Sequence, residues 1–201
     1  MTLDIDRNIA IYLDDRNPIA RYASFDYCFN YFQAHREEGR LDDLLHGDAL
    51  QLSCLHLGFY LASWGMLRGS TELLKRSVRT FVPVVESLVS APSALWTLDV
   101  DGYNATAINE ILEFRSHLRG HLHQGASDIL VTKVMLGTMG CVPALDTSFN
   151  EGSRRRASGR RLYSGSATST GTTPRSSSVI QCRPWISIPE CPRIGATRER
   201  R

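Results

Sequence analysis

The charge of this chain reverses after Glu151, and the reversal limits which part can fold as one unit. Residues 1–151 contain 12 basic and 19 acidic side chains, a net charge of −7, whereas residues 152–201 contain 11 arginines, no lysine and two glutamates, a net charge of +9. The total of +2 hides this opposition. We therefore expect an N-terminal lead-in over residues 1–16, one folded domain over residues 17–151 and a tail over residues 152–201.

The tail has a composition that two different origins would explain. It holds nine serines and five threonines, lacks Asp, Lys and His, and shows no apolar periodicity, as a disordered basic segment would. Out-of-frame translation of a GC-rich gene tends to give the same residues. One of the synonymous back-translations of residues 162–198, read in the neighbouring frame, encodes an amphipathic helix and a short apolar segment without a stop codon. We favour this frameshift over a genuine disordered tail, and we favour either of them over a folded basic domain. The frameshift would remove the last helix of the domain and expose an apolar groove.

The most regular helical pattern spans Asp48–Trp64. Its apolar residues recur every three or four positions along one face: Leu50, Cys54, Leu57, Leu61 and Trp64. A second apolar face holds Leu52, Leu55 and Phe59. A helix that is apolar nearly all round is typical of the centre of a bundle, so we expect this helix to be the central one.

Capping and breaking residues predict where the other helices begin. One helix is expected to begin at Asn17–Pro18, and a second at Ser70 or Thr71, with a restart at Pro83. The later ones are expected to begin at Pro92, at Asn104 or Thr106, and at Ser127. The first of these helices is expected to end near Gly39, and the last near Gly137 or Gly140. No pair of alternating segments joined by a hairpin turn indicates strands. We therefore predict an all-α fold, a single bundle of about six helices, long enough to bury roughly 68–70% of its unfolded surface.

The composition excludes several classes of protein. No run of 18 apolar residues exists, so we expect no membrane-spanning helix. The acidic N-terminus lacks the basic region of a secretory signal. None of the five cysteines forms a C-x-x-C pair, which favours free thiols in a reducing cytoplasm over a structural zinc site; they are Cys28, Cys54, Cys141, Cys182 and Cys191. We expect a cytoplasmic protein without a cofactor or a bound metal.

Two arginines fall inside the apolar stripe of the helix predicted over residues 104–122. The stripe consists of Ile108, Ile111, Leu112, Leu118 and Leu122. Helical geometry places Arg115 and Arg119 within it, and a buried arginine is costly unless it is paired. We favour an ion pair with an acidic residue of a neighbouring helix, or side chains that extend to solvent at the helix end. The alternative is that both arginines bind an anion in a cavity of the bundle.

Lys133 stands among apolar neighbours and is one of only two lysines in the domain. A lysine in such a helix can bind a substrate, form an ion pair with a carboxylate such as Asp146, or extend its amine to solvent. Arg68 lies between Gly65 and Gly69, which either join two helices or admit a ligand close to the backbone. We favour the structural interpretation in both cases, and keep Lys133 and Arg68, with the two arginines above, as candidate anion ligands.

The opposite face of the helix predicted over residues 104–122 carries four further polar residues: Glu110, Glu113, His117 and His121. The spacing of Glu113, His117 and His121 would suit one metal ion, but a solvated face is the simpler interpretation, and we expect no metal site. Arg115 and His121 also fit an R-x5-H pattern, which resembles that of HEPN-type helical ribonucleases, whose arginine and histidine flank the scissile phosphate. A regular helix would hold these two side chains about 120° apart. The acidic domain also disfavours nucleic acid as a partner.

The stretches YLASWGMLRGSTELL, over residues 60–74, and SDILVTKVMLGTMGCVPALDTSFNEG, over residues 127–152, resemble an uncharacterised family of bacterial cytoplasmic proteins. The resemblance spans most of residues 17–151. It implies a bacterial, cytoplasmic, all-α protein. The family has no established activity, so the resemblance assigns no catalytic role to any residue.

No specific catalytic motif emerges, and we expect a non-catalytic helical protein that binds a small anion or a protein partner. A homodimer is one such assembly. The candidate ligand-binding residues are Arg68, Arg115, Arg119 and Lys133. The alternative hypothesis is a HEPN-like ribonuclease of a toxin or defence system, with Arg115 orienting the phosphate and His121 as general acid or base. The hypotheses differ in geometry, because the ribonuclease needs Arg115 and His121 near one exposed cleft.

Overall fold

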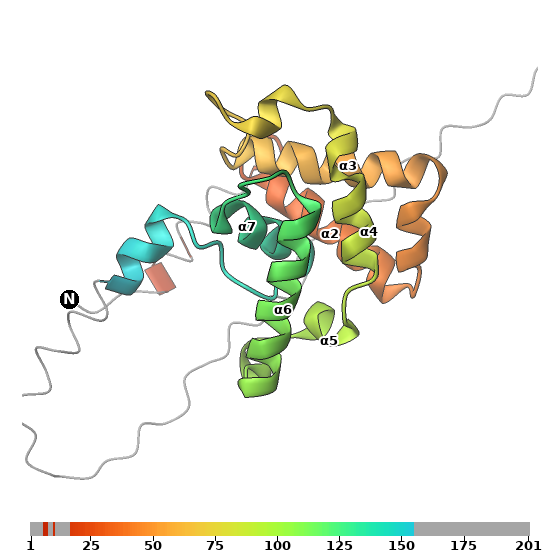
Figure 1. Ribbon diagram of the computed structural model, residues 1–201. Helices are drawn as coiled ribbons and strands as arrows, with labels where there is room; N and C mark the ends of the chain where they lie inside the picture. Colours follow the sequence, from red (N-terminus) through yellow and green to blue (C-terminus); the bar gives the residue numbers. More distant parts are fainter. Residues whose placement is uncertain (1–5, 8–9, 11–16, 155–201) are drawn as a thin grey trace, which may run out of the picture.

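A computed structural model describes residues 6–7, 10 and 17–154 of the chain. The complete α-helices within them are α2 (Ala23–Glu37), α3 (Gly47–Ser63), α4 (Val82–Val89), α5 (Ser93–Thr97), α6 (Ala105–His121) and α7 (Asp128–Thr138). They are connected by the 3-10 segments η1 (Leu41–Leu45), η2 (Glu72–Lys75), η3 (Val78–Phe81) and η4 (Val100–Gly102), and residues 147–154 are helical as well. This part of the chain contains no strand, so the prediction of an all-α bundle of about six helices is confirmed (Figure 1). The predicted frameshifted or disordered tail and most of the lead-in lie outside the described residues.

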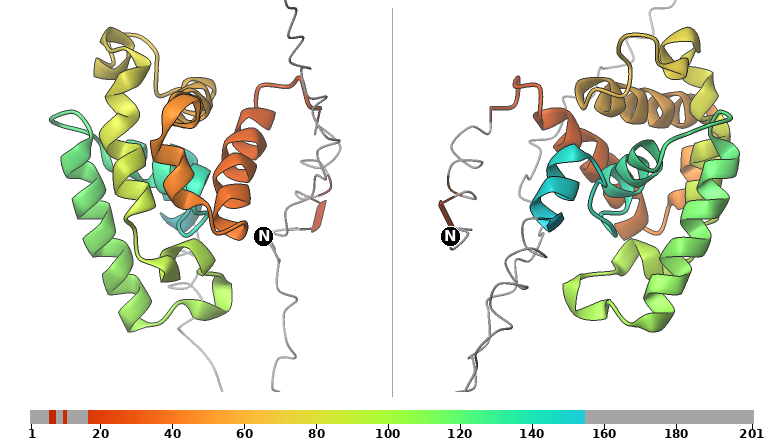
Figure 2. Two further views of the ribbon diagram at one scale, coloured as in Figure 1. Left: turned by 90° about the vertical axis from the view of Figure 1, so that its right-hand side faces the viewer. Right: turned by 60° about the vertical axis from the view of Figure 1, so that its left-hand side comes forward.

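Helix α7 forms the centre of the bundle. Eight of its residues are buried: Leu130, Val131, Thr132, Lys133, Val134, Met135, Gly137 and Thr138. Helices α2, α3 and α6 pack around it, and α4 contacts both α3 and α6. Figure 2 shows α4 and α6 side by side, with α5 joining them at one end. Lys133, in the middle of α7, is therefore surrounded by other helices, whereas Asp128 at its start stays exposed.

The expectation that α3 is the central helix is wrong. The face that holds Leu57 is buried, but Leu52, Leu55 and Phe59 on the other face are 47%, 45% and 69% exposed. Helices α2, α4 and α7, with η1 and η3, cover the remaining sides of α3. An apolar pattern shows which faces could be buried but not which neighbours exist to bury them, and the shorter α7 is the helix that is covered all round.

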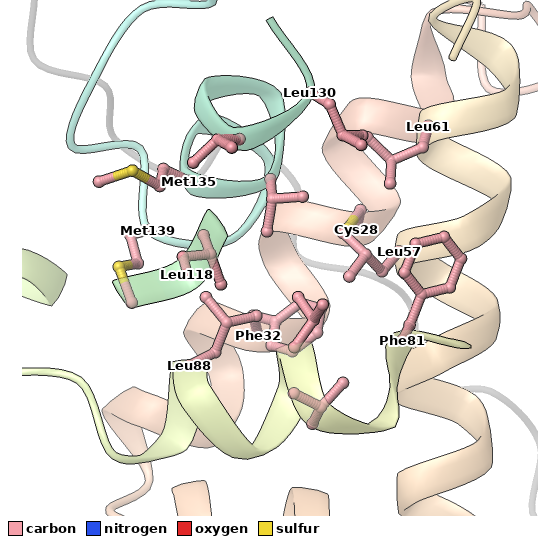
Figure 3. Packing of buried hydrophobic residues seen from close by; sticks show 14 of the residues in the cluster. Cys28, Phe32, Leu57, Leu61, Phe81, Leu88, Leu118, Leu130, Met135 and Met139 are labelled. Atoms are coloured by element: carbon pink, nitrogen blue, oxygen red, sulfur yellow. The ribbon is translucent and has the colours of Figure 1, made fainter. Parts of the chain in front are cut away.

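The core joins side chains from five helices (Figure 3). Phe32 of α2, Leu57 of α3, Leu88 of α4, Leu118 of α6 and Met135 of α7 are all fully buried. Burial of one such side chain stabilises a fold by about 1.5–3 kcal/mol. These contacts connect segments that lie far apart in the sequence, so they fix the positions of all the helices that carry charged candidates.

Gly137 allows α7 to approach α3 closely. A Cβ atom at this position would lie 2.2 Å from Cε1 of Tyr60, far inside normal contact. Tyr60 is fully buried, and its hydroxyl donates a hydrogen bond of 3.1 Å to the carbonyl of Lys133, which holds the ring against α7. The prediction that this helix ends near Gly137 or Gly140 is confirmed, because α7 ends at Thr138 and Gly140 then adopts a left-handed φ of +71°.

The helix starts were predicted with mixed success. Asn104 and Ser127 cap α6 and α7 as expected, since each side chain accepts the backbone N–H three residues ahead, at 2.9 and 3.3 Å. Asn17 does not cap a helix. Its side chain accepts the N–H of Ile19 in a local turn, and α2 begins only at Ala23. A capping residue and a proline are thus equally compatible with a turn.

Two further segments differ from the prediction. Residues 72–81 form two 3-10 turns rather than one helix, although Pro83 lies in the first turn of α4 as expected. On α6, Ile108 and Leu112 are 47% and 46% exposed, whereas Phe114 is buried. The buried face of α6, which holds Ile111, Phe114 and Leu118, is therefore rotated relative to the predicted stripe; α4, α5 and α7 are the helices that pack against α6.

Candidate functional site

The four candidate anion ligands lie in two separate places. Arg115 and Arg119 extend from α6 toward the start of α7. Lys133 and Arg68 lie at the C-terminal end of α3. The two places differ in how much of their positive charge is neutralised by the protein, and this difference decides which of them can bind an anion.

Arg115 and Arg119 share one carboxylate. Nη1 of Arg115 lies 3.7 Å from Oδ1 of Asp128, and Nη2 of Arg119 donates a hydrogen bond to the same oxygen. Asp128 is the first residue of α7, where the helix dipole also favours a negative charge. These side chains remain accessible to solvent, so each pair contributes roughly 0.2–1 kcal/mol. The geometry agrees with the interpretation of both arginines as ion-pair partners of a neighbouring helix.

Lys133 extends from α7 to the C-terminal end of α3. The residue is 5% exposed, and its Nζ donates a hydrogen bond of 2.8 Å to the carbonyl of Trp64. The same ammonium lies 5.8 Å from the centre of the Trp64 ring, within cation–π range. Nε of Arg21 donates a hydrogen bond to the neighbouring carbonyl, that of Ser63. Two cations thus bind carbonyls at the end of α3, where the helix dipole is negative.

Arg68 brings a third cation to the same end of α3. Its guanidinium packs against Gly65, which has a φ of +80°; the guanidinium carbon lies 3.5 Å from the position that a Cβ of Gly65 would take. Burial lowers the pKa of Lys133, and the charges of Arg68 and Arg21 lower it further, whereas Asp146 opposes the shift. Asp146 acts from a distance, since these two described residues form no direct ion pair. We call Arg21, Arg68 and Lys133 the cationic cluster.

The end of α3 also holds hydrogen-bond donors that have no acceptor among the described residues. An ammonium has three N–H groups, and Lys133 uses one of them within the part of the chain that the structure describes. The indole Nε1 of Trp64 is buried and has no hydrogen-bond partner among the described residues. Leaving such a donor unsatisfied costs about 1–3 kcal/mol. This end of α3 therefore combines positive charge with unused donors, which is the chemistry that an anion requires.

Within a single copy of the described chain, the pair required by the ribonuclease hypothesis is not brought together; a meeting across a dimer interface stays a prediction. Helix α6 continues without interruption through Gly120 to His121. Arg115 faces Asp128 of α7, whereas the ring of His121 lies 4.5 Å from the ring of His117, and its Nδ1 contacts the His117 carbonyl. Among the residues that the structure places, no group of three His, Cys, Asp or Glu side chains could hold a metal ion.

Three cysteines in the described region are free and buried: Cys28, Cys54 and Cys141. Burial raises the pKa of the Cys28 thiol, and it raises the pKa of Cys141 to about 12. A thiol that keeps its proton is a poor nucleophile and a poor metal ligand. These cysteines therefore act as core residues and take no part in the site.

Sequence reasoning missed two residues of the site. Arg21 lies in the turn before α2, outside any periodic pattern, and Trp64 was assigned to the apolar face of a core helix. Only the packing of α2 and α7 against α3 brings them to Lys133. A tryptophan and an arginine that flank helix ends are not by themselves a signal, so no local pattern could have identified them.

Comparisons with known proteins add no assignment. No protein family, curated protein or solved structure matches the chain. Within the described residues, no helix has both the length and the apolar character that crossing a membrane requires. The functional interpretation therefore depends on the geometry of the site.

Proposed function

We propose that this chain is a non-catalytic helical binding protein whose cationic cluster holds a small anion at the C-terminal end of α3. The observation that carries the proposal is the position of Lys133. It is 5% exposed, it stands beside Arg21 and Arg68, and it leaves two of its three donors without a partner in the described chain. Asp146 is the acidic residue whose charge opposes this excess.

A bound anion would offset the electrostatic cost of the cluster. Burial and the two arginines favour the neutral amine of Lys133. A phosphate or carboxylate within hydrogen-bonding distance would favour the charged amine and accept its unused N–H groups. The planar guanidinium of Arg68 would add a two-pronged contact, and the amine a point charge, which together suit a phosphate.

The arginines of α6 are the weaker alternative for the same function. Asp128 already takes the place beside Arg115 and Arg119 that an anion would need. An anion there would have to displace a carboxylate that belongs to the protein. We therefore assign these two arginines to the contact between α6 and α7.

We also infer that the protein acts in the bacterial cytoplasm. The three buried, free cysteines of the described region are consistent with a reducing compartment. The resemblance of residues 60–74 and 127–152 to a family of bacterial cytoplasmic proteins points to the same location. Trapping of these cysteines as free thiols in cells would test this inference.

Calorimetric titration at low ionic strength, with inorganic phosphate and succinate as separate probes, tests the proposed binding site. We expect at least one probe to bind the full-length chain, and Lys133→Met, which keeps the aliphatic stem, to weaken binding at least about tenfold. Lys75→Met is the matched control, because Lys75 is exposed and pairs with Glu72 at 3.5 Å. The proposal fails when neither probe binds at millimolar concentration, or when the two variants bind equally well.

A further inference from the structure

Helix α3 exposes a straight row of apolar side chains. Leu52, Leu55 and Phe59 are 47%, 45% and 69% exposed, and Ala62 is exposed as well. Spacings of three, four and three residues place them on one face, opposite the buried side that holds Leu57. We call Leu52, Leu55, Phe59 and Ala62 the apolar row.

The apolar row lies on a helix that is almost without charge. Asp48 is the only Asp, Glu, Lys or Arg residue of α3, and no other occurs before Arg68. The solvated face of a helix normally carries charged residues. Charged residues are instead depleted at the centre of protein interfaces, where aromatic residues are enriched. The composition of this face is therefore that of an interface.

We propose that the apolar row is the centre of a two-fold interface in which α3 packs antiparallel against α3 of a second copy of this chain. In a two-fold contact, each residue meets the residue equally far on the other side of the axis. A two-fold axis that crosses the exposed face of α3 at the level of Leu57 pairs Leu55 with Phe59 of the second copy, and Leu52 with Ala62. The large Phe59 thus never meets itself, and the small Ala62 faces a leucine. A parallel pairing would place Phe59 against Phe59 and leave a gap between the two Ala62 residues.

The charges at the two ends of α3 favour the same arrangement. Asp42 and Asp48 are exposed at its N-terminal end, whereas Arg21 and Arg68 are exposed at its C-terminal end. An antiparallel crossing brings the acidic end of each copy to the cationic end of the other, and it also opposes the two helix dipoles. A parallel crossing would bring like charges together at both ends. Complementary charges at the rim and an apolar centre therefore agree on the orientation.

The exposed area of the row sets the expected strength of the contact. About half of each leucine and two-thirds of Phe59 are exposed, roughly 300 Å² in all. A standard interface buries about 800 Å² on each partner, so the row would supply its centre and the charged ends its rim. We expect a dissociation constant on the order of micromolar.

Sedimentation velocity of the full-length chain, from about 1 to 100 μM, tests the interface. We expect a shift from monomer to dimer over this range, and Phe59→Glu should weaken the dimer at least about tenfold. Leu74→Glu changes a leucine outside the row, 56% exposed, and should leave dimerisation unchanged. Circular dichroism verifies that both variants stay helical. The proposal is refuted if the wild-type chain is monomeric at every concentration, as it would be if another protein covers the row. It is also refuted if the Phe59→Glu variant dimerises like the wild type.

A charge exchange tests the antiparallel orientation separately. Asp48→Arg and Arg68→Asp should each weaken the dimer several-fold, and the two together should restore it, because each end would again meet the opposite charge. If the double variant dimerises more weakly than either single variant, the antiparallel orientation is wrong. Association is the readout, so the result does not depend on whether the cationic cluster binds an anion.

Discussion

Gly137→Ala should destabilise the protein although alanine is the better helix former. The added methyl carbon would lie 2.2, 2.7 and 2.8 Å from three ring carbons of Tyr60, whereas carbon atoms in contact prefer about 3.5–4.0 Å. The ring cannot turn aside freely, because Tyr60 is fully buried and its hydroxyl is bonded to the carbonyl of Lys133. Relief of the contact therefore requires α3 and α7 to move apart.

The magnitude follows from two opposing effects. Overpacking of a core costs about 1–3 kcal/mol, and the fixed ring places Gly137→Ala near the upper end of that range. Alanine gains about 1 kcal/mol over glycine inside a helix. We expect a net loss of about 2 kcal/mol in the free energy of unfolding.

Urea unfolding followed by circular dichroism measures this difference. Gly120→Ala is the control: Gly120 also lies inside a helix, α6, but apart from the adjoining backbone of that helix no described atom lies within 4 Å of its added methyl group. This variant should be as stable as the wild type or up to about 1 kcal/mol more stable. Tyr60→Leu, combined with Gly137→Ala, should show a favourable coupling because the clash is removed. A Gly137→Ala variant as stable as the wild type would refute the close approach of α3 and α7.

Three further predictions concern the core and the second cationic site. Leu118→Ala should lower the free energy of unfolding, measured by thermal unfolding, by about 2–5 kcal/mol, whereas Leu112→Ala, on the exposed side of α6, should change it by no more than about 0.5 kcal/mol. Equal losses of stability in the two variants would contradict the observed rotation of that helix. Asp128→Asn should cost no more than about 1 kcal/mol, because both ion pairs are accessible to solvent, and a larger loss in urea unfolding would show that they are central to the fold. Because burial raises the pKa of Cys28, the folded protein keeps a proton that the unfolded chain loses above pH 9.0. The free energy of unfolding should therefore be unaffected by this thiol below that pH and fall above it, by up to about 1.4 kcal/mol per pH unit. Cys28→Ala should reduce this slope.

The fold class could be predicted from the sequence because it depends on local patterns. The caps at Asn104 and Ser127 need only three residues to form, and both are present in the structure. The position of α3 could not be predicted in the same way. An apolar face at Leu52 and Phe59 looks the same in the sequence whether it faces the core, a second copy or solvent.

The candidate site was predicted only in part, for a related reason. Lys133 stood out because its neighbours are apolar, and Arg68 because it lies between two glycines; both signals are local. Arg21 and Trp64 join them only through the packing of α2 and α7 on α3, which no spacing in the sequence records. The partner of Arg115, Asp128, was likewise expected as an acidic residue of another helix without being identified.

The most direct test of the proposed anion site follows the side-chain nitrogen of Lys133. The chain contains two lysines, Lys75 and Lys133, so selective ¹⁵N labelling of lysine gives two Nζ signals in an NMR titration. We predict that the pKa of Lys133 lies below its ordinary value of 10.5 in the absence of anions and rises when inorganic phosphate is added, while the Lys75 signal does not respond to phosphate. A Lys133 signal that titrates identically with and without phosphate would contradict the proposed site.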